Sequence, residues 1–238
     1  MDEETTSMKN GFFRFADDLL WMMYPSLCAA CGRPLFKGED CICTPCRFNL
    51  PRTGFHLLQE NPIEKHFWGK ANIKNATAYY YFSKGERVQR LIHQLKYKGR
   101  KDVGLFIGTL MGNDLQKSAF NEVDLVIPVP LHVSRQKKRG YNQSDCIAEG
   151  IAGGLKKDYS FSVLERHQAT STQTRKHRFE RYMNVNNIFR VNDSKSVKGK
   201  KILLVDDVIT TGSTLISCAQ SLLEISGTSV YVATLACA

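Results

Sequence analysis

The part of this 238-residue chain that most restricts its fold is the segment 201–223. It begins with Lys201-Ile-Leu-Leu-Val205, an apolar run that is typical of a strand buried on both faces of a parallel sheet. Two adjacent carboxylates, Asp206 and Asp207, come next, and the loop Thr210-Thr-Gly-Ser-Thr214 follows them. Apolar residues at helical spacing close the segment. The sequence therefore predicts a buried strand that ends in two acidic residues, and a hydroxyl-rich loop that opens a helix.

Strand and helix patterns also alternate through the rest of the chain after residue 75. Strands are expected at 76–82, 123–130, 161–164, 182–191, 201–205 and 229–235, and helices at 88–99, 103–111, 142–155 and 215–223. The stretch 52–74 is expected to be irregular, and the basic stretch Arg135–Gln143 is expected to be a loop. Alternation of this kind predicts an α/β domain with a mainly parallel sheet and flanking helices.

The acidic pair and the loop after it suit a sugar that carries a phosphate. In open α/β sheets, ligands bind at the carboxyl ends of the strands. The N–H groups and hydroxyls at a helix N-terminus attract anions, and glycine lets a phosphate approach closely. Two carboxylates beside a phosphate need a separate role, and accepting hydrogen bonds from vicinal sugar hydroxyls is such a role. A simple strand–turn–helix with capping Ser and Thr explains the hydroxyls but leaves Asp206 and Asp207 unexplained.

The charge of the chain points to an anionic partner. Its formal net charge is +10, and the hydrophobic fraction of 42% excludes a mainly disordered or membrane-embedded chain. Two internal segments carry the excess, 84–101 with a net charge of +6 and 131–190 with +7. A charged run is usually a solvated face. Since the basic segments lie next to motifs of the phosphate-binding type, nucleic acid or a phosphorylated small molecule is the partner class that we favour.

The N-terminal stretch Gly11–Tyr24 is apolar but includes charged side chains. It is shorter than a membrane span, and its apolar residues recur at helical spacing. We expect a short amphipathic helix that packs on its own protein rather than a membrane anchor. Since no basic leader or small-residue cleavage site accompanies the stretch, a cytoplasmic location is expected.

Five of the eight cysteines lie between residues 28 and 46. Cys28 and Cys31 form one C-x₂-C pair, and Cys43 and Cys46 form a second after eleven intervening residues. Two such pairs are typical of a tetrahedral structural Zn²⁺ site. Cys41 is an additional thiol, and it could replace Cys43 as a ligand. The alternative to a metal site is a disulfide framework, which a reducing cytosol disfavours. We expect the N-terminal helix and this ribbon to occupy residues 1–55, and the α/β domain to occupy residues 70–238.

At the acidic strand end and the Thr/Gly loop, the sequence resembles the type I phosphoribosyltransferases. In that family, this motif binds phosphoribosyl pyrophosphate (PRPP). The resemblance implies that Asp206 and Asp207 hold the ribose hydroxyls at the catalytic centre and that the loop holds the 5-phosphate. The implied PRPP-binding set is Val205, Asp206, Asp207, Val208, Thr210, Thr211, Gly212, Ser213 and Thr214.

Over nearly its whole length, the chain resembles the ComF family, which includes GntX-type proteins. The resemblance rests on the cysteine ribbon, the PRPP loop and further motifs, namely Leu91–Gly99, Ile127–His132, Arg139–Gln143, Gln173, Arg181 and Asn184. The fifth thiol, Cys41, departs from the pattern. The family is linked to natural DNA uptake, so the resemblance implies single-stranded DNA and proteins of the competence machinery as partners.

The family pattern also implies how the diphosphate of PRPP and its Mg²⁺ are held. The implied pyrophosphate loop comprises Pro130, Leu131, His132, Arg135, Lys138 and Arg139. The implied closing segment is 168–187, with Gln173, Arg178 and Arg181 as its contacting residues.

Three functions remain open from the sequence. The chain is a phosphoribosyltransferase with an unknown acceptor, a non-catalytic zinc- and nucleic-acid-binding accessory protein of competence, or a PRPP-responsive regulator. A regulator that binds DNA directly would be expected to carry a helix-turn-helix segment, and none is apparent.

Overall fold

The computed structural model describes residues 24–166 and 188–238. The chain divides into two compact units, Met1–Asn49 and Leu50–Ala238. Nearly all of the expected N-terminal helix falls outside the described residues. The expected closing segment with Gln173, Arg178 and Arg181 also lies outside them.

The first unit holds the cysteine-rich segment in a small irregular fold. A β-bridge joins Leu27 to Pro34, and the helix α2 spans Thr44–Asn49. The backbone N–H of Ala29 donates to the carbonyl of Cys41. This hydrogen bond joins the first C-x₂-C pair to the segment just before the second pair. Apart from Cys31, the cysteines of this unit are buried.

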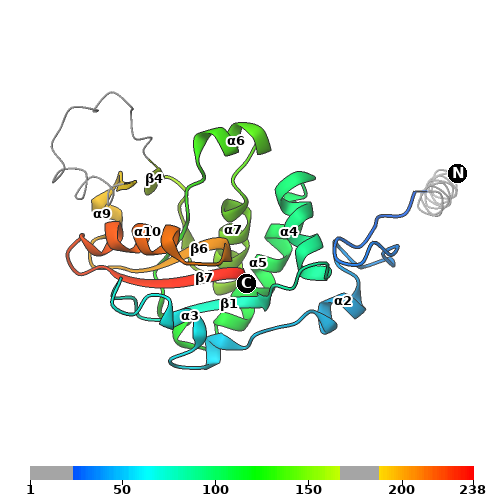
Figure 1. The fold of residues 1–238 in the computed structure, drawn as a ribbon, viewed down its shortest axis with the longest axis horizontal. Helices are drawn as coiled ribbons and strands as arrows, with labels where there is room; N and C mark the ends of the chain where they lie inside the picture. The colour runs from blue at the N-terminus through cyan, green and yellow to red at the C-terminus, as the bar shows by residue number, and fades with distance from the viewer. Residues whose placement is uncertain (1–23, 167–187) are drawn as a thin grey trace, which may run out of the picture. The chain divides into compact units, whose positions relative to one another are not determined.

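A five-stranded parallel sheet forms the centre of the second unit (Figure 1). Its strands lie in the order β1 (Ala76–Tyr81), β7 (Ser229–Cys237), β6 (Lys201–Ile209), β2 (Leu125–Pro128) and β3 (Asp158–Tyr159). Every neighbouring pair is parallel. The mainly parallel α/β sheet expected from the sequence is thereby confirmed. A separate antiparallel pair joins β4 (Leu164–Arg166) to β5 (Phe189–Val191).

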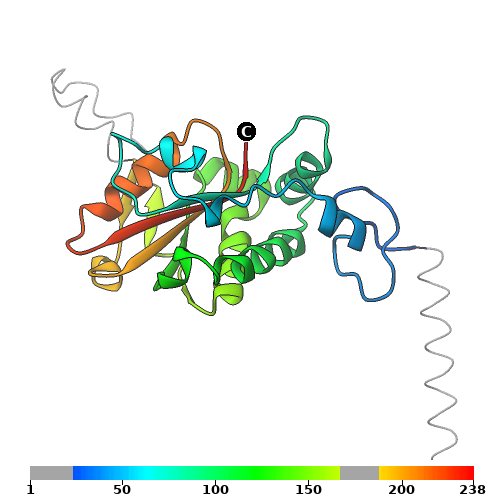
Figure 2. The same ribbon diagram turned by 90° about the horizontal axis from the view of Figure 1, so that it is seen from below.

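Helices cover both sides of this sheet (Figure 2). Helix α10 (Ser213–Leu223) lies on one side, and α5 (Lys101–Leu115) and α7 (Gln143–Leu155) lie on the other. The remaining described helices are η1 (Phe55–Leu57), α3 (Pro62–Lys65), α4 (Arg87–Tyr97), η2 (Ala119–Glu122), α6 (Val133–Arg139) and α9 (Ser194–Val197). The stretch 52–74 is thus less irregular than expected, because it includes η1 and α3.

The basic stretch expected to be a loop is mostly helical, so that expectation was wrong. Helix α6 spans Val133–Arg139 and ends at Gly140, whose φ of 78° lies in the left-handed region. Arg, Lys and Gln favour helix, but no residue of α6 is buried. Without an apolar stripe, a pattern search based on hydrophobic spacing has nothing to detect.

Several strand boundaries also differ from the expected ones. Strand β6 continues to Ile209, because it pairs with β7 through Ile209 and Cys237. Asp206 and Asp207 therefore lie inside the last part of the strand rather than after it. The expected strand at 161–164 is found at 164–166, and of the expected strand 182–191 the described part is 189–191.

Helices α5 and α7 contact each other through glycines. A Cβ atom on Gly108 would lie 2.4 Å from the Ile147 carbonyl oxygen, and one on Gly112 would lie 2.4 Å from that of Ile151. Such distances are below any real contact, so the two backbones approach as closely as they do because side chains are absent. The contact fixes α7, whose N-terminal residues enter the site described below.

Replacing one of two adjacent glycines in α7 tests this contact. We expect Gly154→Ala to lower the free energy of unfolding by about 1–3 kcal/mol, because its Cβ would lie 2.6 Å from the Thr109 carbonyl oxygen. The matched control is Gly153→Ala, whose Cβ meets nothing within 4 Å. That variant should gain about 0.5–1 kcal/mol from helix propensity. Equal effects in chemical denaturation would contradict the close approach.

Candidate functional site

A pocket of about 470 Å³ lies where β6 and β2 end. Its walls come mainly from the end of β6 with the turn after it, the β2–α6 connection with helix α6, helix α4, the N-terminus of α7 and the end of β4. Of the expected PRPP-binding residues, five line it, namely Asp206, Asp207, Val208, Thr210 and Thr214. The Val205 side chain is buried in the core and does not line the pocket.

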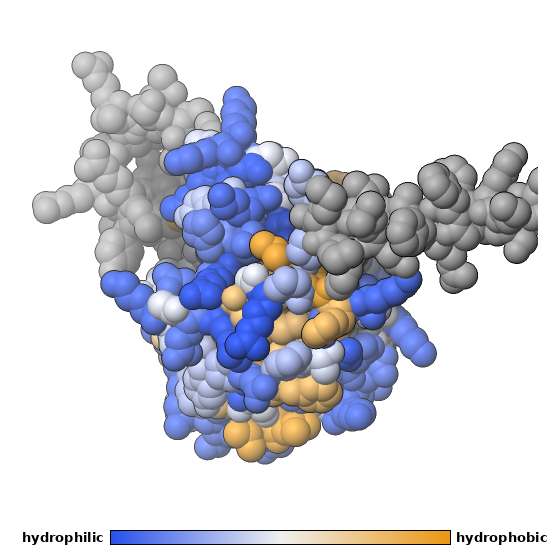
Figure 3. Space-filling view, turned by 90° about the vertical axis from the view of Figure 1, so that its right-hand side faces the viewer, coloured by the Kyte–Doolittle hydropathy of each residue, from blue (hydrophilic) through white to orange (hydrophobic). Residues whose placement is uncertain are grey.

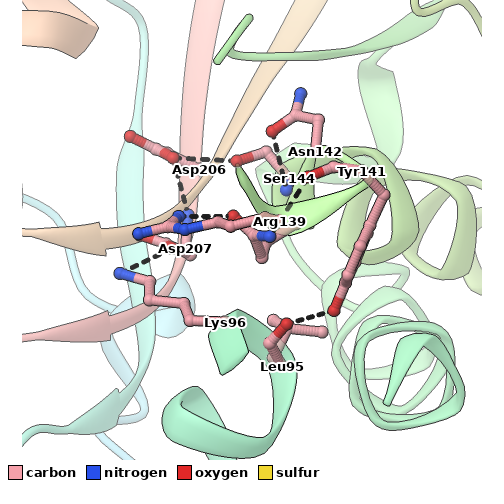
Figure 4. A network of polar contacts seen from close by, with 9 residues as sticks. Leu95, Lys96, Arg139, Tyr141, Asn142, Ser144, Asp206 and Asp207 are labelled. Atoms are coloured by element: carbon pink, nitrogen blue, oxygen red, sulfur yellow. Dashed lines mark hydrogen bonds and ion pairs between the residues drawn. The ribbon is translucent and has the colours of Figure 1, made fainter. Parts of the chain in front are cut away.

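Asp206 is the more enclosed of the two carboxylates. Its Oδ1 accepts hydrogen bonds from the Ser144 hydroxyl at 2.9 Å and from the Asp207 backbone N–H at 2.8 Å (Figure 4). Burial, followed by the charge of Asp207, raises the pKa of Asp206 to about 7. A carboxyl in this state exchanges its proton near neutral pH, and a ligand that donates hydrogen bonds to it favours the ionised form.

Asp207 has a different partner. Its Oδ2 lies 2.7 Å from the Lys96 ammonium of α4, and the two side chains are only 15% and 21% exposed. Figure 4 shows the two acidic side chains diverging, Asp206 toward α7 and Asp207 toward α4. Ligand hydroxyls would therefore meet one carboxylate held by neutral donors and one held by a cation.

The turn after β6 forms a small hollow of about 60 Å³ beside the pocket. It is lined by Thr210–Leu215 together with the end of β6. Gly212 has a φ of 74° at the N-cap of the 11-residue helix α10, which requires glycine at this position. The hydroxyls of Thr211 and Ser213 lie 2.9 Å apart. Hydroxyls and N–H groups concentrated at a helix N-terminus are suited to an anion.

The expected pyrophosphate loop is split by the structure. Four of its residues line the pocket, namely Pro130, Leu131, Arg135 and Arg139. His132 instead caps α6, where its Nδ1 accepts the Ser134 backbone N–H at 3.2 Å. Lys138 does not line the pocket and faces a neighbouring groove.

Sequence reasoning missed the residues that α4 and α7 contribute. Helix α4 lines the pocket with Gln89, Ile92, His93, Lys96 and Tyr97. The signal was present, because residues 84–101 are strongly basic and include one of the family motifs. However, the ion pair between Lys96 and Asp207 spans more than a hundred residues, so spacing within the chain does not predict it. Ser144 and Arg166 were missed for the same reason.

The segment from Arg139 to Ser144 fastens three elements around the pocket. The Tyr141 hydroxyl donates to the Leu95 carbonyl of α4, and the Asn142 side-chain amide donates to the Val129 carbonyl at 3.0 Å. Arg139 donates to the Gln143 side-chain oxygen at 2.6 Å. This segment therefore holds α4, the end of β2 and α7 in fixed positions around the acidic pair.

The four cysteines expected to bind metal form one cluster in the first unit. The sulfurs of Cys28, Cys31, Cys43 and Cys46 all lie within 4.8 Å of one another. The Cys31 and Cys43 sulfurs are 3.7 Å apart, close to the edge of about 3.8 Å of a tetrahedron with Zn–S bonds of about 2.3 Å. None of the eight cysteines forms a disulfide. The cluster is compatible with structural zinc, and its third member along the chain is Cys43 rather than Cys41.

Backbone donors support a metal-binding state of Cys28. Burial raises the pKa of its thiol, but the backbone N–H groups of Cys43, Cys31 and Ala30 more than offset this and lower it to about 7. The Cys43 N–H lies 3.3 Å from the Cys28 sulfur. Thiolate is the form that binds metal.

No helix in the described part of the chain is long and apolar enough to cross a membrane. On the face in Figure 3, hydrophilic residues predominate, and hydrophobic residues form smaller areas among them.

The chain is similar to one known protein family over part of its length and to individual proteins over most of it. The phosphoribosyl transferase domain family matches residues 142–237, which include the end of β6 and its turn. The DNA utilization protein YhgH of Escherichia coli K12 is 30% identical over 229 residues, covering 87% of this chain and 95% of the relative. The competence protein ComFC of Bacillus subtilis is 24% identical over 198 residues, covering 83% and 72%.

Among solved structures, the glutamine PRPP amidotransferase of B. subtilis, complexed with ADP and GMP, is similar to this chain with a TM-score of 0.43. The two are 23% identical, and the similarity covers 60% of this chain and 30% of the other.

The cysteine cluster gives a direct prediction. We expect Cys28→Ser to reduce the zinc-to-protein ratio, measured by elemental analysis, from about one to near zero, because three thiolates and a hydroxyl bind Zn²⁺ poorly. Cys41→Ser is the matched control, since Cys41 lies in the same unit but outside the cluster, and it should keep its zinc. Loss of zinc from the Cys41 variant alone would contradict the assigned ligands.

Proposed function

The chain belongs to the ComF family of competence and DNA utilization proteins and carries a phosphoribosyltransferase-type domain, and we propose that the pocket of this domain binds PRPP together with Mg²⁺. One observation carries the proposal: two carboxylates with different partners lie directly before a hydroxyl-rich turn at a helix N-terminus. A phosphorylated sugar presents both the hydroxyls that the carboxylates would accept and the phosphate that the turn would hold.

Each part of PRPP has a matching set of residues. The 5-phosphate would occupy the hollow of Thr210, Thr211, Gly212, Ser213 and Thr214, which offers N–H groups and hydroxyls. The ribose hydroxyls would donate to Asp206 and Asp207. Carboxylate and phosphate oxygens together are the donors that Mg²⁺ prefers. When bound, Mg²⁺ would neutralise part of the charge on the diphosphate.

Binding requires Asp207 to exchange partners. In the described structure its carboxylate is paired with Lys96, so a ribose hydroxyl would replace that ammonium. Lys96 lines the pocket together with Arg135 and Arg139, and its ammonium would then stabilise the diphosphate. The ion pair thus keeps a half-buried carboxylate compensated until the ligand arrives.

Phosphoribosyl transfer is the reaction that this arrangement serves. The bond between the anomeric carbon and the diphosphate oxygen breaks, the acceptor forms a bond to the same carbon, and the diphosphate leaves with the electron pair. Arg135 and Arg139 would stabilise the leaving diphosphate, and the two carboxylates would favour the positive charge that develops on the ring. His132, held at the α6 cap, would contribute by fixing the start of this helix.

Removal of both carboxyl charges tests PRPP binding. We expect Asp206→Asn combined with Asp207→Asn to weaken PRPP affinity at least about a hundredfold in isothermal titration with Mg²⁺, because two charge-assisted hydrogen bonds are lost. Asp158→Asn removes one exposed carboxylate from β3 and should leave the affinity unchanged. Affinity should also rise with pH through about 7, because Asp206 must be ionised. Retained affinity in the double variant would refute the assignment.

Handling of single-stranded DNA is a second candidate function, and it does not require catalysis. The net charge of +10 and the exposed basic helix α6 favour it, and two of the relatives are named for DNA utilization and competence. In this function the protein would act as an accessory of the competence machinery, with the cysteine cluster as a zinc-stabilised module. Its reduced thiols fit a cytoplasmic location.

The salt dependence of binding separates the two functions. If lysines and arginines neutralise strand phosphates, the affinity for a short oligothymidylate should fall steeply as salt rises, because counterions are released. Fluorescence anisotropy measures the affinity at each of several salt concentrations and so gives the slope of affinity against salt. An affinity that is independent of salt would count against DNA handling and would leave the proposed binding of PRPP unaffected.

A further inference from the structure

A second cavity, of about 560 Å³, adjoins the PRPP pocket. We call it the α4–α6 groove, since it is lined by the end of α4 and one side of α6, namely Lys96, Tyr97, Gly99, Arg135, Lys138 and Arg139. Four of these residues also line the PRPP pocket, so the two cavities share a wall. Lys138 is the cation that belongs to the groove and not to the pocket.

The groove carries positive charge that the protein does not compensate. No ion pair joins Arg135, Lys138 or Arg139 to a carboxylate within residues 24–166 and 188–238. Helix α6 has no acidic residue, and none of its side chains is buried. Like charges on neighbouring side chains repel each other. Because the side chains of α6 are not buried, they do not contribute to the packing of the core either. A bound anion would remove this repulsion.

An exposed aromatic ring accompanies the cations. Tyr97 is 61% exposed, and the Arg139 guanidinium lies 5.6 Å from the centre of its ring. His93, one turn earlier in α4, lies next to Tyr97, with ring centres 4.9 Å apart and the two ring planes tilted by 46° rather than stacked. An aromatic surface beside several cations is suited to a ligand with a flat ring and a phosphate, because it offers stacking and charge neutralisation together.

We propose that the α4–α6 groove binds the phosphate of a second ligand, a nucleotide, while PRPP occupies the adjoining pocket. The proposal deepens the proposed function, since it rests on PRPP binding in the pocket and assigns an anionic acceptor or partner to the same site. The ring of the nucleotide stacks on Tyr97, and its phosphate contacts Lys138. Arg135 and Arg139, on the shared wall, lie between the two anions and neutralise both.

The alternative is that Lys138 serves the diphosphate of PRPP, as the family pattern implies. The two assignments predict different effects of the same substitution. If Lys138 contacts the diphosphate, its loss weakens PRPP; if it belongs to the groove, its loss weakens the second ligand and leaves PRPP affinity unchanged.

Two adjacent lysines of α6 provide the test. Lys137 and Lys138 are both exposed and carry the same charge, but Lys138 alone of the two lines the groove. The full-length wild type, Lys137→Gln and Lys138→Gln are first titrated with PRPP and Mg²⁺. Each protein, saturated with PRPP, is then titrated with thymidine 3′-monophosphate, with thymidine and with a short oligothymidylate. A 3′-phosphate avoids imitating the 5-phosphate of PRPP.

We expect Lys138→Gln to weaken thymidine 3′-monophosphate or oligothymidylate about fivefold to tenfold and to leave PRPP affinity unchanged. Lys137→Gln should change neither. Thymidine should bind the wild type more weakly than its 3′-phosphate. Weakening of the monophosphate identifies a free nucleotide as the ligand, and weakening of the oligonucleotide alone identifies a strand.

Three results would overturn the proposal. Equal effects of the two lysine substitutions would make the charge of α6 non-specific. Loss of PRPP affinity in Lys138→Gln would return this residue to the diphosphate. Absence of binding by both phosphate ligands to a PRPP-saturated wild type would leave the groove without a nucleotide. Failure of the wild type to bind PRPP at all would instead refute the proposed function, and the first titration detects that separately.

Discussion

Two adjacent carboxylates inside a buried strand are the constraint on which the rest of the structure depends. Pairing of β6 with β7 as far as Ile209 keeps Asp206 and Asp207 in extended backbone, so they project in different directions. Enclosing a carboxylate is costly unless each oxygen finds a donor. Ser144 and a backbone N–H supply donors to Asp206, and Lys96 supplies a charge to Asp207. Burial and the charge of Asp207 nevertheless raise the pKa of Asp206, so a ligand that donates hydrogen bonds to this carboxyl would favour its ionised form.

The positions of these donors depend on packing far from the pocket. Ser144 begins α7, whose place beside α5 depends on glycines that let the two backbones meet. Lys96 lies near the end of α4, which the Tyr141 hydroxyl holds through the Leu95 carbonyl. The glycines between α5 and α7 thus fix the position of Ser144. The Tyr141 hydroxyl fixes the position of Lys96. A substitution in either place would alter the site without touching a ligand.

Local sequence was sufficient for the elements that carry their own pattern. The apolar run before Asp206, the glycine that opens α10 and the two C-x₂-C pairs each predicted the local structure that is found. Helix α6 was missed because it has no apolar side to reveal it, and the choice between Cys41 and Cys43 depended on how the loop closes in space. Lys96 and Ser144 were missed because their partners are distant in the chain. Contacts made across the sheet edge were therefore beyond the reach of the sequence.

A crystal structure of the full-length chain with PRPP and Mg²⁺ tests the central claim most directly. The account predicts the 5-phosphate in the turn Thr210–Thr214, the ribose hydroxyls within hydrogen-bond distance of Asp206 and Asp207, and the Lys96 ammonium moved from Asp207 toward the diphosphate. A structure in which PRPP binds elsewhere, or in which the turn stays empty while Lys96 and Asp207 remain paired, would contradict it.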